Sequence, residues 1–337
     1  MKITTKEVRE ITKILDDIVE EYKKETPKQK RNWRTYEQRV AQRLKIAFHE
    51  LKPLVHEACK SITVVRGETR GAKPTLDLEQ KVLLLLLKHL IQKSNRDMSI
   101  MLIVFSWLTD VEVSYKTIER LYSDQDVICA LYNLHVLILK KKGVEKANCG
   151  GDGTGYALTV KKHYATEAQK LKDKVKDNSL KNKRTRTFIF SFRLIDIETR
   201  MYIATGTSFK SEQEAFLNAL ALAKETGISI KSARLDRNFS RQVYIKNWED
   251  TIGKTKFFLI PKKNATVKGP WEWKKMLFRF VRNTKAYLHE YYQRNQSESG
   301  FAEDKKRCGW KLGQKREDRI DTADMLTSLW HNLYWLG

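Results

Sequence analysis

Apolar side chains recur every three to four residues through the first part of the chain, a pattern that predicts amphipathic helices. The first apolar stripe comprises Val8, Ile11, Leu15, Ile18 and Val19. Residues 64–75 contain two glycines and one proline, which indicates a linker, and Thr75 at its end is a good N-cap for the helix that follows. We therefore expect an N-terminal helical unit over residues 1–63 and a linker over residues 64–75.

A second helical unit is predicted over residues 76–146, where three short apolar stretches are separated by tight connections. Ser114 can cap the third of these helices. The spacing suits a helix-turn-helix-like DNA-binding domain, although a plain helical bundle fits the same pattern about as well. The pattern does not identify which helix would enter a DNA groove.

The periodicity changes to that of strands near Asn148. Residues 187–206 are rich in β-branched and aromatic side chains and can form a hairpin that turns at residues 198–200. Helix, strand, helix and strand are expected next, over residues 211–227, 228–236, 241–250 and 256–262, with Gly227 as a C-cap. This order predicts an α/β domain over residues 147–337. Its mixed five-stranded sheet would be flanked by helices, as in ribonuclease H-like cores, with a short insertion over residues 263–285.

The chain is strongly basic, because its 65 lysines and arginines exceed its 41 acidic residues by 24. Such a surface attracts polyanions, and nucleic acid is the first candidate, whereas a generally lysine-rich surface is the plainer explanation. Basic residues are concentrated in KLKDKVKDNSLKNKRTR, residues 170–186, which we interpret as a solvated loop or arm able to contact DNA. Charge alone does not decide between the two explanations.

Cysteine spacing and hydropathy argue against several other classes of protein. The four cysteines lie far apart and form no C-x-x-C pair, so neither a zinc knuckle nor a disulfide framework is indicated, and a reducing cytosol fits. The first residues lack the apolar core of a signal peptide, and the longest apolar stretch, residues 82–91, is too short to span a bilayer. We therefore expect a cytoplasmic protein without a membrane partner.

Two aspartates lie at positions of the predicted sheet where functional side chains are often found. Asp152 lies in CGGDGTGY, whose glycines would let another backbone approach the carboxylate, although Asp-Gly is also a common turn dipeptide. Asp236 ends an apolar strand just before a helix, a position at which such sheets place functional side chains. Asn238 lies in the sharp turn DRNF and is expected to adopt the left-handed conformation that glycine usually provides.

A further group of polar residues lies near the C-terminus, in HEYYQRNQSESGFAEDKKRCGW. At about 100° per residue, four of its side chains would fall within about 60° of one another on a helix. They are Tyr291, Arg294, Glu298 and Lys305. A surface ion-pair cluster is the usual explanation for such charges. Phe301 points roughly the same way, however, which indicates a face turned toward the protein or a ligand.

With these residues the chain resembles the DDE transposases of prokaryotic insertion sequences, in the branch marked by Tyr-x2-Arg-x3-Glu-x6-Lys. The resemblance extends through DGTGY, LDRNFSRQVY and RIDTADMLTSLWHNLYWL and covers roughly residues 76–335. It implies a ribonuclease H-like core in which Asp152, Asp236 and Glu298 are catalytic and hold two Mg²⁺ or Mn²⁺ ions. The chain departs from the family at Asn238, where glycine is usual. It also has only 61 residues between Asp236 and Glu298, which leaves no room for the large insertion of some relatives.

The activity of this family follows from the same resemblance. It implies a protein that binds terminal inverted repeats, cleaves DNA by metal-assisted hydrolysis and joins the 3′-OH ends to target DNA by transesterification. It also implies a homodimer in the synaptic complex and a place in the prokaryotic nucleoid, with Tyr291, Arg294 and Lys305 on the phosphates of the transposon ends. Two other interpretations stay open, a DNA-binding protein that no longer cuts and a structure-specific nuclease. The three intact carboxylates argue against the first, and the Tyr–Arg–Glu–Lys pattern argues against the second.

Two tryptophans in the predicted insertion are further candidates for DNA contact. Trp271 and Trp273 follow a Gly-Pro pair and are flanked by lysines, so either indole could stack on an unpaired base. The alternative is that one ring packs under the catalytic helix, because aromatic side chains mostly serve cores. On a helix the two side chains would lie about 200° apart, so one ring can face inward and the other toward DNA.

Overall fold

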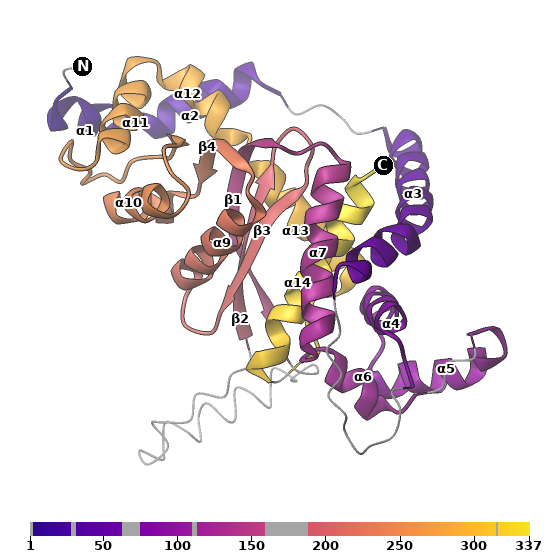
Figure 1. Cartoon of the computed structure of the whole chain (residues 1–337). Helices are drawn as coiled ribbons and strands as arrows, with labels where there is room; N and C mark the ends of the chain where they lie inside the picture. The colour runs from indigo at the N-terminus through magenta and orange to yellow at the C-terminus, as the bar shows by residue number, and fades with distance from the viewer. Residues whose placement is uncertain (1–2, 28–31, 63–74, 110–112, 159–187, 315) are drawn as a thin grey trace, which may run out of the picture.

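The computed structural model describes residues 3–27, 32–62, 75–109, 113–158, 188–314 and 316–337. The basic segment 170–186 lies outside these ranges. The first helices (Figure 1) are α1 (Thr5–Lys13), α2 (Leu15–Glu25), α3 (Trp33–Lys60), α4 (Leu78–Leu90), α5 (Asn95–Thr109), α6 (Tyr115–Leu121) and α7 (Gln125–Lys141). They are followed by β1 (Lys146–Ala157), β2 (Phe188–Asp196), β3 (Tyr202–Ser208), α9 (Glu212–Thr226), β4 (Ser229–Leu235), α10 (Gln242–Thr251) and β5 (Lys256–Phe258). The last helices are α11 (Trp271–Arg282), α12 (Thr284–Tyr292), α13 (Asn295–Cys308) and α14 (Glu317–Trp335).

The five strands form one mixed sheet in the order β3-β2-β1-β4-β5. The β1–β2 and β2–β3 pairs are antiparallel, while β4 lies parallel to both β1 and β5. The predicted α/β fold with helices around a five-stranded sheet is therefore confirmed, and the strand order is that of ribonuclease H-like proteins. The last strand is shorter than expected, because regular pairing with β4 ends at Phe258.

Helices cover both faces of the sheet. Helix α9 lies on one face, and α13 and α14 lie on the other (Figure 1). The close approach of α9 depends on Gly206 in β3, where an added Cβ would lie only 2.3 Å from the backbone nitrogen of Ala219. On the opposite face, cross-strand pairing sets Asp152, Arg193 and Thr205 side by side beneath α13 and α14. This second face carries the polar residues that matter for the site.

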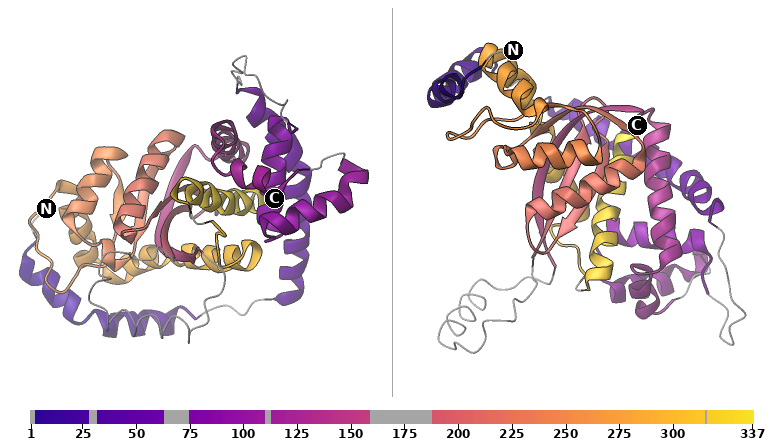
Figure 2. Two further views of the ribbon diagram at one scale, coloured as in Figure 1. Left: turned by 90° about the horizontal axis from the view of Figure 1, so that it is seen from below. Right: turned by 60° about the vertical axis from the view of Figure 1, so that its left-hand side comes forward.

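The N-terminal helices contact the rest of the chain at two separate places. Helices α1 and α2 lie against α11 and α12, whereas α3 packs against α4, α7 and α14 (Figures 1 and 2). The ring of Tyr22 in α2 stacks on Tyr292 in α12, with centroids 5.4 Å apart. Lys285 of α12 pairs with Glu21 and Glu25 of α2 at 2.7 and 3.0 Å. The segment that leads into α13 is thus braced by the first two helices.

Helix capping and local backbone conformation are as predicted at two positions and different at two others. Ser114 accepts a hydrogen bond from the Thr117 backbone, and Gly227 ends α9 at a φ of +71°, both as predicted. The expected N-cap Thr75 is wrong: Asp77 caps α4, because it and the side chain three residues later exchange two hydrogen bonds that Thr75 lies too early to make. Asn238 is not left-handed, because it lies in a short 3₁₀ turn (Arg237–Phe239).

In the described ranges, none of the helices has the length and apolar character needed to cross a bilayer.

Candidate active site

The sheet brings the two predicted aspartates together. Asp152 lies in β1 and Asp236 directly follows β4, and these strands are parallel neighbours whose register pairs Gly151 with Leu235. The backbone N–H of Gly153 donates to Asp152 at 2.9 Å, and that of Asn238 donates to Asp236 at 3.2 Å. Each aspartate is therefore held by a local backbone hydrogen bond at adjacent positions of the sheet.

The third carboxylate comes from α13, which crosses β1 at very short range. An added Cβ at Gly150 would lie 3.1 Å from Ser297 Oγ and 3.4 Å from the Cα of Arg294, so glycine permits this approach. Glu298 lies in the first turn of α13, and its side chain is 54% exposed. The helix thus delivers a solvent-accessible carboxylate next to the two aspartates.

Arg294 links all three carboxylates. Its guanidinium lies 3.3 Å from Asp152 Oδ2, 3.6 Å from Asp236 Oδ1 and 3.0 Å from Glu298 Oε1. The aromatic ring of Tyr291 lies 5.5 Å from the same guanidinium, and Tyr291 is itself buried, which raises its pKa to about 12. The structure therefore brings five of the predicted site residues into one cluster with the Arg294 guanidinium at its centre.

Burial raises the pKa of Asp152 to about 6. The Arg294 charge and the Gly153 N–H act in the opposite direction, while the negative charges of Glu298 and Asp236 add to the rise. The charge of one arginine thus does not fully offset the burial of this carboxylate. A further positive charge next to Asp152 would therefore be favourable.

Lys305 lies apart from this cluster, farther along β1. Its ammonium group donates to Thr154 Oγ1 at 2.7 Å and lies 5.2 Å from the ring of Tyr156. Trp310, which no sequence pattern indicated, lies 5.1 Å from the same ammonium group and is 67% exposed. The predicted single helix face is therefore incorrect in one respect. The chain turns at Gln293 and Arg294, so Tyr291 belongs to α12 while Lys305 belongs to α13.

A buried ionic network fixes α13 on the sheet. The guanidinium of Arg193 in β2 pairs with Asp304 of α13 at 2.7 Å and with Asp324 of α14 at 2.9 Å. Asp304 also accepts from the hydroxyl of Tyr202 at 2.7 Å and lies 2.8 Å from His331. Burial opposes ionisation of Asp304, but His331 and Arg193 outweigh it and hold its pKa below the usual range. Because Asp304 and Glu298 share α13, this network also positions the catalytic candidate.

The two candidate tryptophans differ in environment. Trp273 is buried, and its indole N–H donates to the carbonyl of Thr266 at 2.8 Å. Trp271 is 57% exposed, with the ammonium group of Lys275 5.6 Å from its ring. One ring therefore packs inside the protein while the other is exposed to solvent, a difference in burial that agrees with the helical spacing.

A fourth carboxylate, which no sequence pattern indicated, lies nearby, on the α9 face of the sheet. The side chain of Glu212, the first residue of α9, lies against Gly153, where an added Cβ would be 2.0 Å from its Oε1. Burial raises the pKa of Glu212, and the charges of Asp152 and Asp236 raise it further. Only the folded sheet reveals this neighbour, because its position at a helix start looks like ordinary capping.

The donor chemistry of the cluster fits a divalent cation. Asp152, Asp236 and Glu298 supply hard carboxylate oxygens, which Mg²⁺ and Mn²⁺ prefer. Within the described ranges no three acidic, histidine or cysteine side chains are already arranged to hold an ion, and the Arg294 guanidinium lies among these carboxylates.

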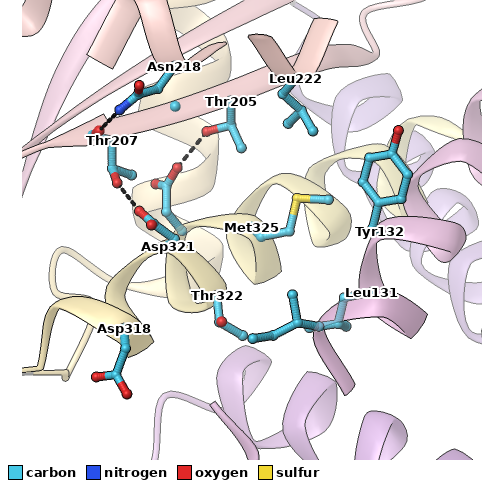
Figure 3. A pocket seen from close by; sticks show the side chains of 13 residues that line it. Leu131, Tyr132, Thr205, Thr207, Asn218, Leu222, Asp318, Asp321, Thr322 and Met325 are labelled. Carbon is cyan, nitrogen blue, oxygen red and sulfur yellow. Dashed lines mark hydrogen bonds between the residues drawn. The ribbon is translucent and has the colours of Figure 1, made fainter. Parts of the chain in front are cut away.

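A separate cavity of about 560 Å³ opens between α7, β3, α9 and α14 (Figure 3). Leu131, Leu222 and Met325 form its apolar side, and Asp321, which is hydrogen-bonded to Thr207, lies at its polar side (Figure 3). None of the three candidate catalytic carboxylates lines this cavity.

Comparisons with known proteins identify the family of this chain. No protein-family model matches the chain, and no solved structure matches it. A curated protein of Archaeoglobus fulgidus, described as "Probable transposase for insertion sequence element ISA1214", is 39% identical over 333 residues. The match covers 99% of this chain and 97% of that protein. The chain therefore belongs to the transposases of insertion sequence elements.

Proposed function

We propose that this transposase cleaves DNA at the ends of its element and joins the freed 3′-OH groups to target DNA, with Asp152, Asp236 and Glu298 as the catalytic carboxylates. One observation carries the proposal. Three acidic side chains from three separate elements converge on one partly open cluster, although they lie far apart in the sequence. This arrangement is the one that metal-assisted phosphoryl transfer needs.

The three carboxylates would hold two Mg²⁺ or Mn²⁺ ions, which when bound would activate the attacking oxygen and stabilise charge on the phosphorus and the leaving oxygen. The protein itself supplies orientation and counter-charge. Asp152 and Asp236 are fixed by the sheet, and Glu298 is fixed through α13. The exposed side of Glu298 leaves the cluster accessible to a DNA strand.

Arg294, Lys305 and Tyr291 are proposed to contact the phosphates of the transposon end, which would place the protein in the Tyr-x2-Arg-x3-Glu-x6-Lys branch. Arg294 is close enough to the carboxylates to reach a phosphate held there, and a guanidinium can bind two phosphate oxygens at once. Lys305 would hold the strand farther along β1. The buried Tyr291 ring supports the Arg294 side chain.

The test uses the purified full-length protein, Mg²⁺ or Mn²⁺, labelled DNA carrying the ends of the element, and a target plasmid. We expect Asp152→Ala, Asp236→Ala and Glu298→Ala each to abolish cleavage and strand transfer while end binding in a gel-shift assay is nearly retained. Asp250→Ala, which removes an exposed carboxylate of α10, is the matched control and should keep full activity. Full cleavage by any of the first three variants would remove that residue from the proposed site.

A further inference from the structure

A second concave surface lies at another side of α13, between the start of α3, the β2–β3 turn and the end of α14. It encloses about 540 Å³, and we call it the arginine groove after Arg39, Arg43 and Arg200, which line it with Tyr36, Glu303 and Trp335. Glu303 follows Glu298 by five residues, a rotation of about 140° around the helix. The groove therefore opens away from the carboxylate cluster.

Three cations and a large aromatic ring are gathered in this groove. The guanidinium of Arg43 lies 3.7 Å from the ring centroid of Trp335, and that of Arg200 lies 4.8 Å from it. Among the residues that the structure describes, no carboxylate forms an ion pair with any of the three arginines. The groove thus holds three positive charges and one carboxylate, that of Glu303, and this excess of positive charge favours an anionic ligand.

The turn that presents Arg200 is held in a conformation that side chains rarely adopt. Arg200 has a φ of +62°, in the left-handed region where glycine is favoured. Its N–H donates to the Asp196 carbonyl at 2.8 Å, and its own carbonyl lies 2.8 Å from His331 Nε2. An arginine kept where glycine would fit better indicates that the side chain is needed at this place.

Other groups in the groove and beside it suit a nucleotide better than a simple anion. Trp33 is 65% exposed and packs edge-on against Tyr36, with centroids 5.8 Å apart, so an aromatic surface adjoins the cations. One oxygen of Glu303 and the indole N–H of Trp335 are buried and have no hydrogen-bond partner in the described chain. A carboxylate acceptor beside arginines disfavours bare phosphate but can accept from the exocyclic amine of a base.

We propose that the arginine groove binds an unpaired stretch of DNA strand, with phosphates on the arginines and a base against the aromatic rings. The inference rests on the proposed function, because it assigns to the same enzyme a second DNA contact outside its catalytic cluster. Aromatic rings interleaved with cations are the usual surface for single-stranded DNA, since every base offers a face for stacking. A DNA strand engaged at the cleavage site could thus be held at a second point.

The test measures binding of a fluorescent 12-nucleotide single strand of mixed sequence by anisotropy, in full-length protein that also carries Asp152→Ala to prevent cleavage. Arg39→Glu reverses an exposed charge, and Arg200→Gly removes a cation while relieving the positive φ, so neither should lower the melting temperature. Each should weaken binding at least about fivefold and reduce its salt dependence. Lys45→Glu, an equal charge reversal on an exposed position of α3 that does not line the groove, should change binding less than about twofold.

Three results would overturn the proposal. The first is equal binding of the single strand by the parent and all variants. This result would overturn the groove alone, because cleavage of the element's ends by the protein with Asp152 intact tests the proposed function separately. The second is an equal loss of affinity for a duplex of the same length, which would mean that the surface reads paired DNA. The third is full displacement of the strand by a free deoxynucleoside monophosphate at micromolar concentration, which would indicate a nucleotide pocket instead.

Discussion

Replacing Asp152 with asparagine should make the metal-free protein more stable while abolishing cleavage. The carboxylate is only 15% exposed, and its burial outweighs the attraction of Arg294. Asparagine has nearly the same shape and carries no charge, so it removes the unfavourable burial of the anion and keeps an oxygen for the Gly153 N–H. The variant, in which an amide nitrogen replaces one carboxylate oxygen, should therefore change stability and activity in opposite directions.

The size of the effect follows from the pKa of Asp152. A rise from 3.8 to about 6 corresponds to about 3 kcal/mol in the free energy of unfolding. At low pH the carboxyl is protonated in the folded and unfolded chains and contributes nothing. As the pH rises from 3.8 to about 6, the unfolded chain loses its proton first, so the parent loses stability and the variant does not. The full difference is present above pH 6, and about half of it remains at pH 5.

Thermal melts in EDTA at pH 5 and pH 7.5 measure this difference. The Asp152→Asn variant should melt higher than the parent by on the order of 5 °C at pH 7.5 and by clearly less at pH 5. Glu298→Gln is the control, because more than half of that side chain is exposed and solvent already screens its charge. Added Mg²⁺ should stabilise the parent more than the variant if the proposed function is correct. Equal melting of parent and Asp152→Asn at pH 7.5, or a difference independent of pH, would refute the reasoning.

Three further predictions concern the scaffold. Asp304→Asn leaves a buried arginine without one of its two carboxylates and should lower the free energy of unfolding by about 3–5 kcal/mol in urea denaturation; a loss under about 1 kcal/mol would contradict the network. Gly206→Ala places a Cβ against the backbone of Ala219 and should destabilise by about 1–3 kcal/mol or more, so an unchanged melt would show that α9 shifts freely. Trp273→Ala should cost about 3–5 kcal/mol, while Trp271→Ala should melt like the parent and weaken a step after first-strand nicking. Identical melts for the two tryptophan variants would contradict their different burial.

Local sequence patterns were enough to predict most of the sheet. The hairpin of β2 and β3 and the end of α9 at Gly227 depend on residues close together in the chain, so periodicity and capping rules apply directly. The N-cap of α4 was misplaced because Thr75 and Asp77 are both good capping residues. Only the reciprocal hydrogen bonds with Gln80 decide between them.

The candidate site was predicted as a set of residues but not as a geometry. A motif could select Asp152, Asp236 and Glu298, yet their convergence depends on the register of β1 against β4 and on how closely α13 crosses β1. The angular positions calculated at about 100° per residue assumed that residues 291–305 form one helix. The chain instead makes a tight turn in which the Arg294 N–H donates to the Tyr291 carbonyl at 3.2 Å and the Arg294 carbonyl accepts from Ser297 at 2.9 Å.

The burial of Arg193 shows why part of the site could not be predicted locally. In FIFSFRLID a single arginine within an apolar strand is typical of a solvent-facing position, because alternate side chains of a half-exposed strand point outward. Here helices cover both faces, so Arg193 is fully buried and its ionic partners come from α13 and α14, more than 100 residues later in the chain. A buried ion pair is weak support for stability compared with apolar packing, but its directional bonds allow few alternative placements of a helix. Since Asp304 and Glu298 lie on the same helix, the bonds that orient Asp304 also determine where Glu298 meets the sheet.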